Sequence, residues 1–132
     1  VGELVIAADT SGSMGPYYKL LFGEIATMCK QTNPAAVRIL WWDTSVCGDQ
    51  VFKPTDYDQI ASLLKPKGGG GTTPDCVPKY LRKEVITPDA VVVLTDGEVN
   101  GWGEWDCPVL WAIYNPRSKI TAPVGKTIHI ED

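Results

Sequence analysis

Short, uninterrupted apolar runs recur along the chain and predict buried strands. Three runs, at residues 4–8, 90–95 and 109–114, are rich in branched side chains and bounded by Gly, Pro or a charge. Such runs are typical of parallel strands that are covered on both faces. The run at 37–42 continues through a polar turn to residues 51–52, which predicts a hairpin with a short edge strand. A further strand is predicted at 127–130.

Between these runs the apolar positions follow helical spacing. Residues 16–31 place Tyr17, Leu21, Ile25 and Met28 on one face, and Pro16 suits a first helical turn. A shorter and weaker pattern covers residues 57–64. The pattern therefore predicts one long helix and one short helix in the first half of the chain.

A third helix is predicted after a run of four glycines. Thr73 can cap it, Pro74 fits its first position, and Asp75 suits the positive end of its dipole. Val77 and Leu81 then face inward. Lys79, Arg82 and Lys83 complete the helix near its negative end.

The order of these elements predicts the fold class. Alternating strands and helices are typical of an α/β, doubly wound, mostly parallel central sheet. No repeat or linker divides the chain, so residues 1–132 form a single predicted domain. Gly97, Gly101 and Gly103 oppose a helix between residues 97 and 108, so the helices are expected to be trimmed near the C-terminus.

Composition narrows the class further. The 132 residues carry 16 acidic and 12 basic side chains, a formal charge of −4, which argues against a general nucleic-acid binder and against a basic membrane anchor. No apolar run approaches the roughly 20 residues of a membrane span. Four dispersed cysteines and one histidine favour free thiols and a cytoplasmic location over disulfides or a zinc site. Because the chain starts directly on a strand, we expect a fragment or C-terminal part of a longer protein.

Oxygen-bearing side chains follow the predicted strands. Asp9, Ser11 and Ser13 lie on one loop after the first strand, Thr72 follows the glycine run, and Asp96 ends the strand at 90–95. Sites in open parallel sheets form beyond the carboxyl ends of the strands. Carboxylate and hydroxyl oxygens suit Mg²⁺ or Mn²⁺ and are poor ligands for zinc or copper.

These three elements together resemble the von Willebrand factor A-type domain with its metal-ion-dependent adhesion site. The resemblance rests on the Asp-x-Ser-x-Ser pattern, the Gly-Gly-Thr loop and Leu-Thr-Asp-Gly-Glu at 94–98. The strand around Trp111 and the ending at 125–130 are more specifically similar to the A-type domain at the C-terminal end of bacterial and phage metallopeptidases.

The resemblance implies a metal site and a way of binding. The implied ligands are Asp9, Ser11, Ser13, Thr72 and Asp96, with Asp9 acting partly through water. Mg²⁺ favours six oxygens, so a protein partner's Asp or Glu would complete the shell. This function is an interaction and not catalysis, and chaperone-like ATPases are a candidate partner class. The candidate partner contacts are Gly12, Met14, Gly71, Glu98, Trp102 and Trp105.

Other interpretations of the same residues remain. Asp9 can cap a helix, the glycine run can be a plain loop, and the site can be a scaffold without metal. A P-loop is excluded because no Gly-Lys-Ser/Thr follows the glycines, and Ser11 stands where a haloacid-dehalogenase-type phosphatase needs a second Asp. No HExxH is present and the only histidine is His129, so a metallopeptidase or hydrolase would have its catalytic part upstream. An RNA-associated A-type domain is disfavoured by the charge.

Overall fold

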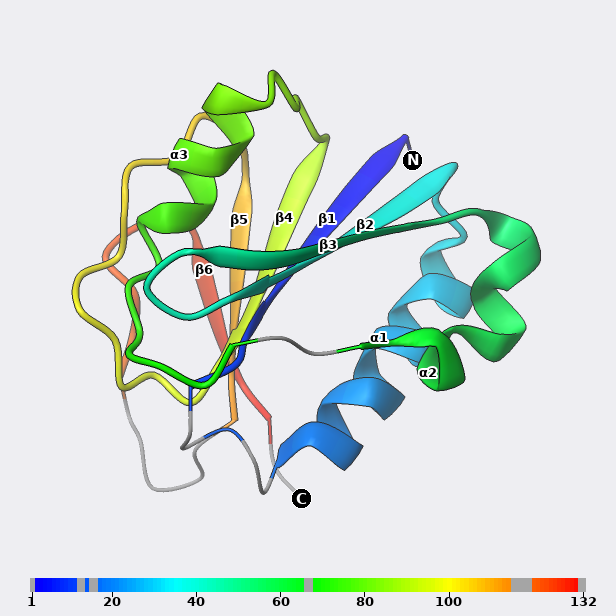
Figure 1. The fold of residues 1–132 in the computed structure, drawn as a ribbon, viewed down its shortest axis with the longest axis horizontal. Helices are drawn as coiled ribbons and strands as arrows, with labels where there is room; N and C mark the ends of the chain where they lie inside the picture. The colour runs from blue at the N-terminus through cyan, green and yellow to red at the C-terminus, as the bar shows by residue number, and fades with distance from the viewer. Residues whose placement is uncertain (1, 12–13, 15–16, 66–67, 115–119, 131–132) are drawn as a thin grey trace.

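A six-stranded sheet forms the centre of the molecule (Figure 1), with the strand order β3-β2-β1-β4-β5-β6. The computed structural model describes residues 2–11, 14, 17–65, 68–114 and 120–130. All strand pairs are parallel except β2 with β3. The strands are β1 (Glu3–Asp9), β2 (Ala36–Trp42), β3 (Val46–Phe52), β4 (Ala90–Thr95), β5 (Val109–Ile113) and β6 (Lys126–His129). The predicted α/β fold with a mostly parallel sheet is confirmed.

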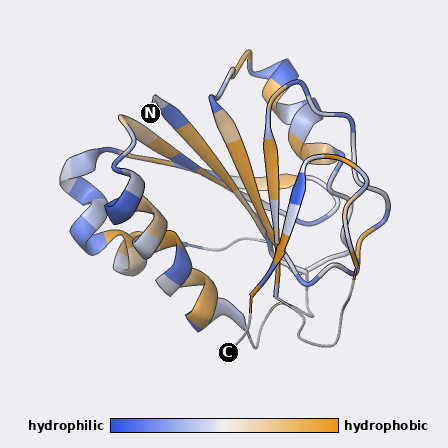
Figure 2. Cartoon of the chain, turned by 180° about the vertical axis from the view of Figure 1, so that it is seen from behind, coloured by the Kyte–Doolittle hydropathy of each residue, from blue (hydrophilic) through white to orange (hydrophobic). Residues whose placement is uncertain are grey.

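Helices cover both faces of the sheet, as Figures 1 and 2 show. One face carries α1 (Tyr18–Thr32), the 3₁₀ helix η2 (Pro54–Gln59) and α2 (Ile60–Leu63), and the other carries α3 (Cys76–Lys83). Side chains of a strand alternate between the faces, so β1 contributes to two separate cores. Its apolar residues are almost fully buried on both sides.

The two adjacent tryptophans of β2 illustrate this double burial. Trp41 packs with the α1 core and Trp42 with the α3 core, and both side chains are fully buried. The indole N–H of Trp41 donates to Gln50 on β3 at 2.9 Å. Both side chains thus pack within the fold, and neither lies at the surface.

The hairpin strand is longer than predicted. β3 spans seven residues instead of two, and its antiparallel pairing with β2 begins at Val46. The side chains of β3 are only partly covered, so polar residues are tolerated there. Gly48, Asp49 and Gln50 therefore interrupt the apolar pattern that predicts the strand. An ion pair of 2.7 Å between Arg38 on β2 and Asp49 helps to hold the polar part of the strand.

The helices also differ from the prediction at their starts. The long helix begins at Tyr18, and the predicted Pro16 start lies outside the described residues. The weak pattern at 57–64 is two elements, because a 3₁₀ helix starting at Pro54 precedes a single turn of α-helix. Residues 97–108, all of which are described, contain no helix, as predicted.

The predicted Thr73 cap is wrong. Helix α3 begins at Cys76 with Asp75 at its N-cap position, and no side chain caps it. The backbone N–H of Thr73 donates to the carbonyl oxygen of Asp43 at 2.9 Å, which ties this residue to the turn between β2 and β3. Because this contact with a distant part of the chain holds Thr73, the helix begins later than predicted. Val77 and Leu81 face the core as predicted.

The end of α3 carries a strained residue. Val85 has a φ of 54°, and the N–H of Ile86 donates to Leu81 O while that of Val85 donates to Arg82 O. This pair of bonds is a Schellman motif, whose left-handed position is usually glycine. Val85 is also 82% exposed, so its side chain gains little from burial in this fold.

We expect Val85→Gly to stabilise the protein. A left-handed conformation costs an L-residue about 1–2 kcal/mol, part of which is offset by the greater freedom of glycine in the unfolded chain. The net gain should be about 1 kcal/mol, measured as the free energy of unfolding in urea. Val85→Ala keeps the left-handed Cβ and is the control. A loss of stability in Val85→Gly would show that the side chain is held by favourable contacts.

Candidate metal-binding site

The first buried carboxylate of the site stands at the end of β1. Asp9 lies opposite Trp42 of β2, and the β1–β4 register that pairs Ala8 with Leu94 brings Thr95 beside it. Because β1 is parallel to both neighbours, the three carboxyl ends meet at one edge of the sheet. Asp9 is fully buried there, and the carboxyl end of β1 lies at the lower edge of the sheet in Figure 1.

Hydrogen bonds fix the orientation of this carboxylate. The backbone N–H of Ser11 donates to Asp9 Oδ1 at 2.8 Å, and the hydroxyl of Thr95 donates to Oδ2 at 2.7 Å. The Thr95 hydroxyl in turn accepts the N–H of Gly97 at 3.3 Å. Thr95 thus links the loop after β4 to the carboxylate at the end of β1.

Burial makes the charged form of Asp9 costly. Desolvation raises the pKa of Asp9 above its usual value, the hydrogen bonds from Thr95 and Ser11 oppose this, and the negative charge of Asp96 adds to the rise. An ionised Asp9 is therefore less stable in the folded chain than in water. A cation at this edge would remove that penalty.

The second carboxylate follows β4. Asp96 is 3% exposed and its Oδ1 accepts the N–H of Glu98 at 3.0 Å. Among the described residues, the ion pairs of the protein involve Arg38, Lys79 and Arg82, and none of them includes Asp9 or Asp96. Two buried like charges thus share one corner of the fold with no basic partner in the described part of the chain.

The glycine run brings a hydroxyl to the same edge. Thr72 is buried, and its carbonyl oxygen accepts the N–H of Asn100 from the loop after β4 at 2.8 Å. Gly68 has a φ of 137°, and a Cβ there would collide with the hydroxyl of Thr10. The loop can therefore lie against the end of β1 only because glycine stands at that position.

Asp43 holds this loop and was not predicted as part of the site. Its Oδ2 accepts the N–H of Gly70 at 3.2 Å, and its carbonyl oxygen accepts the N–H of Thr73. Its other carboxylate oxygen accepts the N–H of Ser45 at 3.1 Å. Asp43 thus ties the residues on either side of Thr72 to the turn after β2. In the sequence it looks like an ordinary turn residue.

The structure brings most of the predicted ligands to one edge. Asp9, Ser11, Thr72 and Asp96 are all buried at the carboxyl ends of the strands or on the loops that leave them. Ser13 and Gly12 lie outside the described residues. Whether they complete the site stays a prediction.

The predicted partner contacts that the structure describes divide into three groups by exposure. Gly71 and Glu98 are exposed on the loops of the site. Met14 is fully buried in the core with α1 and so does not fit a surface contact. Trp102 and Trp105 are half-buried and pack edge-on against Trp111, with ring centroids 4.9 and 5.7 Å apart.

The oxygen donors fit a hard cation. No group of three or more His, Cys, Asp or Glu side chains suited to a metal occurs in the described part of the chain. The site predicted here differs from such a group because it combines two carboxylates with hydroxyls. Oxygen-only donors and two uncompensated charges match the preferences of Mg²⁺ or Mn²⁺.

The family of the chain follows from a comparison with family models. The model of the VWA-like domain family DUF2201 matches residues 4–131, nearly the whole sequence. The chain belongs to this family. No curated protein matches it. The VWA-like assignment agrees with the six-stranded sheet and with the position of the candidate site at the carboxyl ends of its central strands.

Domains of the VWA type often mediate protein interactions, and the family assignment supports an interaction or accessory role. No helix in the described residues of this VWA-like domain is long and apolar enough to cross a membrane. The four cysteines, Cys29, Cys47, Cys76 and Cys107, are free thiols in the structure.

We expect Asp9 and Thr95 to stabilise the fold jointly. A hydrogen bond to a charged group contributes about 1.5–3 kcal/mol, so Asp9→Asn and Thr95→Val should show a coupling free energy of about 1.5 kcal/mol in a double-mutant cycle of urea unfolding. As the control, Thr87→Val changes an exposed threonine and should show no coupling with Asp9→Asn. A coupling below about 0.5 kcal/mol, the usual error of additivity, would contradict this role for Thr95.

Proposed function

We propose that this VWA-like domain is a non-catalytic protein-interaction module whose partner binding depends on Mg²⁺ or Mn²⁺. The observation that carries the proposal is the pair of buried carboxylates, Asp9 and Asp96, at adjacent strand ends without a basic partner among the described residues. Two such charges in a fold are costly unless a cation lies near them.

The residues that would hold the metal have distinct roles. Asp9 and Asp96 supply the negative charge, while Ser11 and Thr72 supply neutral hydroxyls, with Ser13 as the remaining predicted ligand. Thr95 and Asp43 act indirectly, because the first orients Asp9 and the second holds the loop that carries Thr72. When bound, the metal supplies a positive centre with a coordination position open to a partner's oxygen.

The number of oxygen ligands selects the class of partner. The two carboxylates and three hydroxyls proposed as ligands would supply fewer than the six oxygens that Mg²⁺ favours, so the carboxylate of a partner's Asp or Glu is a favourable further ligand. Exposed Gly71 and Glu98 lie on the loops around this position. A chaperone-like ATPase is one candidate partner, and an accessory role beside the catalytic part of a metallopeptidase or hydrolase is compatible with the same chemistry.

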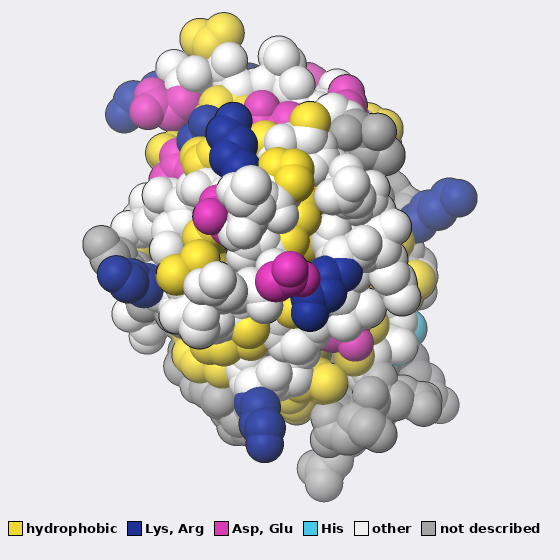
Figure 3. All heavy atoms as spheres, turned by 90° about the vertical axis from the view of Figure 1, so that its right-hand side faces the viewer, with side chains coloured by type: hydrophobic (Ala, Val, Ile, Leu, Met, Phe, Trp, Pro, Cys, Tyr) yellow, Lys and Arg dark blue, Asp and Glu magenta, His cyan; other side chains and the backbone are white. Residues whose placement is uncertain are grey.

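One face of the molecule and the net charge support a protein over a nucleic acid as partner. On the face formed by α1, η2 and α2, Lys and Arg side chains lie mostly apart and form no continuous stripe (Figure 3). Nucleic-acid-binding domains gather such side chains on one face. The net charge of −4 agrees with this.

Metal binding is tested by comparing the stability of Asp96→Asn with that of the unchanged protein, first without metal and then with Mg²⁺. The difference in unfolding free energy should change sign between the two conditions. In EDTA, Asp96→Asn should be as stable as the unchanged protein or more so, because one of two like charges is gone. In Mg²⁺ at about 100 times the Kd, the unchanged protein should gain about 2.7 kcal/mol of unfolding free energy and the variant much less. Asp58→Asn removes an exposed charge elsewhere and should behave like the unchanged protein in both conditions. An equal Mg²⁺ effect on all three chains would contradict the site.

Partner recognition is tested with paired peptides. An array in which each Glu or Asp peptide has a Gln or Asn counterpart should retain the labelled domain on acidic members only, and only with Mg²⁺ or Mn²⁺ present. EDTA should release it, and Asp96→Asn should not bind. Retention that is indifferent to EDTA or to the Glu→Gln change would contradict carboxylate recognition.

A further inference from the structure

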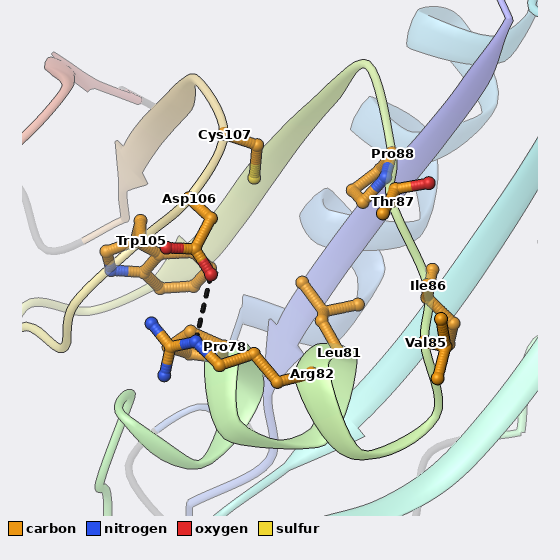
Figure 4. A pocket seen from close by; sticks show the side chains of 10 residues that line it. All are labelled: Pro78, Leu81, Arg82, Val85, Ile86, Thr87, Pro88, Trp105, Asp106 and Cys107. Atoms are coloured by element: carbon orange, nitrogen blue, oxygen red, sulfur yellow. Dashed lines mark hydrogen bonds and ion pairs between the residues drawn. The ribbon is translucent and has the colours of Figure 1, made fainter.

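A cavity lies at the opposite edge of the sheet from the carboxylates. It is bounded by α3, by the segment 85–88 that leads into β4, and by residues 105–107 before β5, and has a volume of about 280 Å³. Figure 4 shows Leu81, Trp105 and Cys107 around an apolar interior. Because β4 and β5 start here, this cavity is separate from the site at their carboxyl ends.

The cavity is held open by specific contacts. Arg82 on α3 donates from Nε to Asp106 Oδ2 at 2.9 Å and from Nη2 to the carbonyl oxygen of Glu104 at 2.6 Å. The indole N–H of Trp105 donates to the carbonyl oxygen of Trp102 at 2.7 Å. The wall formed by Trp105 is therefore fixed in place by contacts within the chain.

The rim of the cavity carries an exposed apolar residue in a strained backbone conformation. Val85 lines the cavity, is 82% exposed, and stands at the left-handed position where glycine is favoured. Ile86 beside it is half-buried. Contacts within the described fold do not account for a branched apolar side chain at this position. A partner that covers the rim would bury it.

Size and charge indicate the occupant. Small-molecule sites usually measure about 300–1,000 Å³, so a cavity of about 280 Å³ suits one large side chain better than a drug-sized ligand. The charged residues that line it are Arg82 and Asp106, which form an ion pair with exposed fractions of 43% and 75%. Their charges cancel, which favours an uncharged group in the cavity.

The ion pair also suits a peptide backbone. Arg82 presents N–H donors and Asp106 presents acceptor oxygens side by side at the mouth, as the dashed line in Figure 4 shows. An amide group offers one acceptor and one donor and so complements this pair. A protein segment with a large apolar residue meets the demands of both the interior and the mouth.

We propose that this cavity is a second protein-binding site, which takes one large apolar side chain, Leu, Phe or Trp, from a partner segment whose backbone lies across Arg82 and Asp106. Buried aromatic or aliphatic anchors of this kind supply much of the binding energy at interfaces. The site needs no metal, so it operates whether or not the carboxylate edge binds a cation.

The test uses blocked tripeptides and the five tryptophan indole N–H signals of the ¹⁵N-labelled chain. N-acetyl-Gly-Trp-Gly-amide and its Leu counterpart should shift the Trp105 signal saturably, with or without EDTA. The signal of Trp41, on the other face of the sheet, should not move. The Ala tripeptide should bind at least about tenfold more weakly, because little apolar surface is buried.

A pair of variants at one position separates binding from folding. Cys107→Phe should fill the cavity and abolish the Trp105 shift, whereas Cys107→Val should leave room for the tripeptide. Both should keep the other indole signals in place. If Cys107→Phe does not fold, Thr87→Phe at the exposed side of the rim replaces it.

Several outcomes would overturn the proposal. Equal binding of the Ala and Trp tripeptides would exclude a side-chain cavity. Equal affinity for free indole and the Trp tripeptide would exclude the backbone contact, which should contribute about fivefold. A Trp105 signal that shifts with the concentration of the chain itself would assign the cavity to a second copy instead.

Discussion

The parallel pairing of β1 between β2 and β4 is the constraint on which the carboxylate site depends. It places the carboxyl ends of three strands at one edge, and the hydrogen bond from Thr95 to Asp9 joins two of them. Both groups are buried, so the bond cannot be replaced by water without opening the core. Asp96, one residue after Thr95, is then carried to the same edge. Like charges thus meet because of the sheet, at an energetic cost that a cation can offset.

The glycine loop completes this arrangement through a different kind of contact. It comes from a distant part of the chain and is held by Asp43 and Asn100, which hydrogen bond to Gly70, to Thr73 and to Thr72. Glycine at position 68 allows the loop to approach Thr10 closely. The carboxylate edge is therefore a junction of four segments. The strand pairing positions the ends of β1 and β4, whereas hydrogen bonds to the turn after β2 and to the loop after β4 position the glycine loop.

The opposite edge of the domain is built on other principles. Arg82 links α3 to the segment before β5 and leaves an apolar cavity between them. One edge of the same VWA-like sheet thus offers charge and the other offers apolar surface. Partners at the two edges would be selected by different chemistry, and the two sites share no surface.

The sequence by itself determined the buried parallel strands, the fold class and the motif residues. Such strands are continuous apolar runs, Asp9 and Asp96 stand directly after two of them, and Thr72 follows the run of glycines. It did not determine the start of α3 or the length of β3, since Thr73 is held by Asp43 and the polar strand is held by β2. Only the tertiary structure decided the role of Asp43 and the cavity at Trp105. These depend on contacts between segments 20 or more residues apart, such as the 27 that separate Asp43 from Gly70, and such contacts leave no periodic pattern in the sequence.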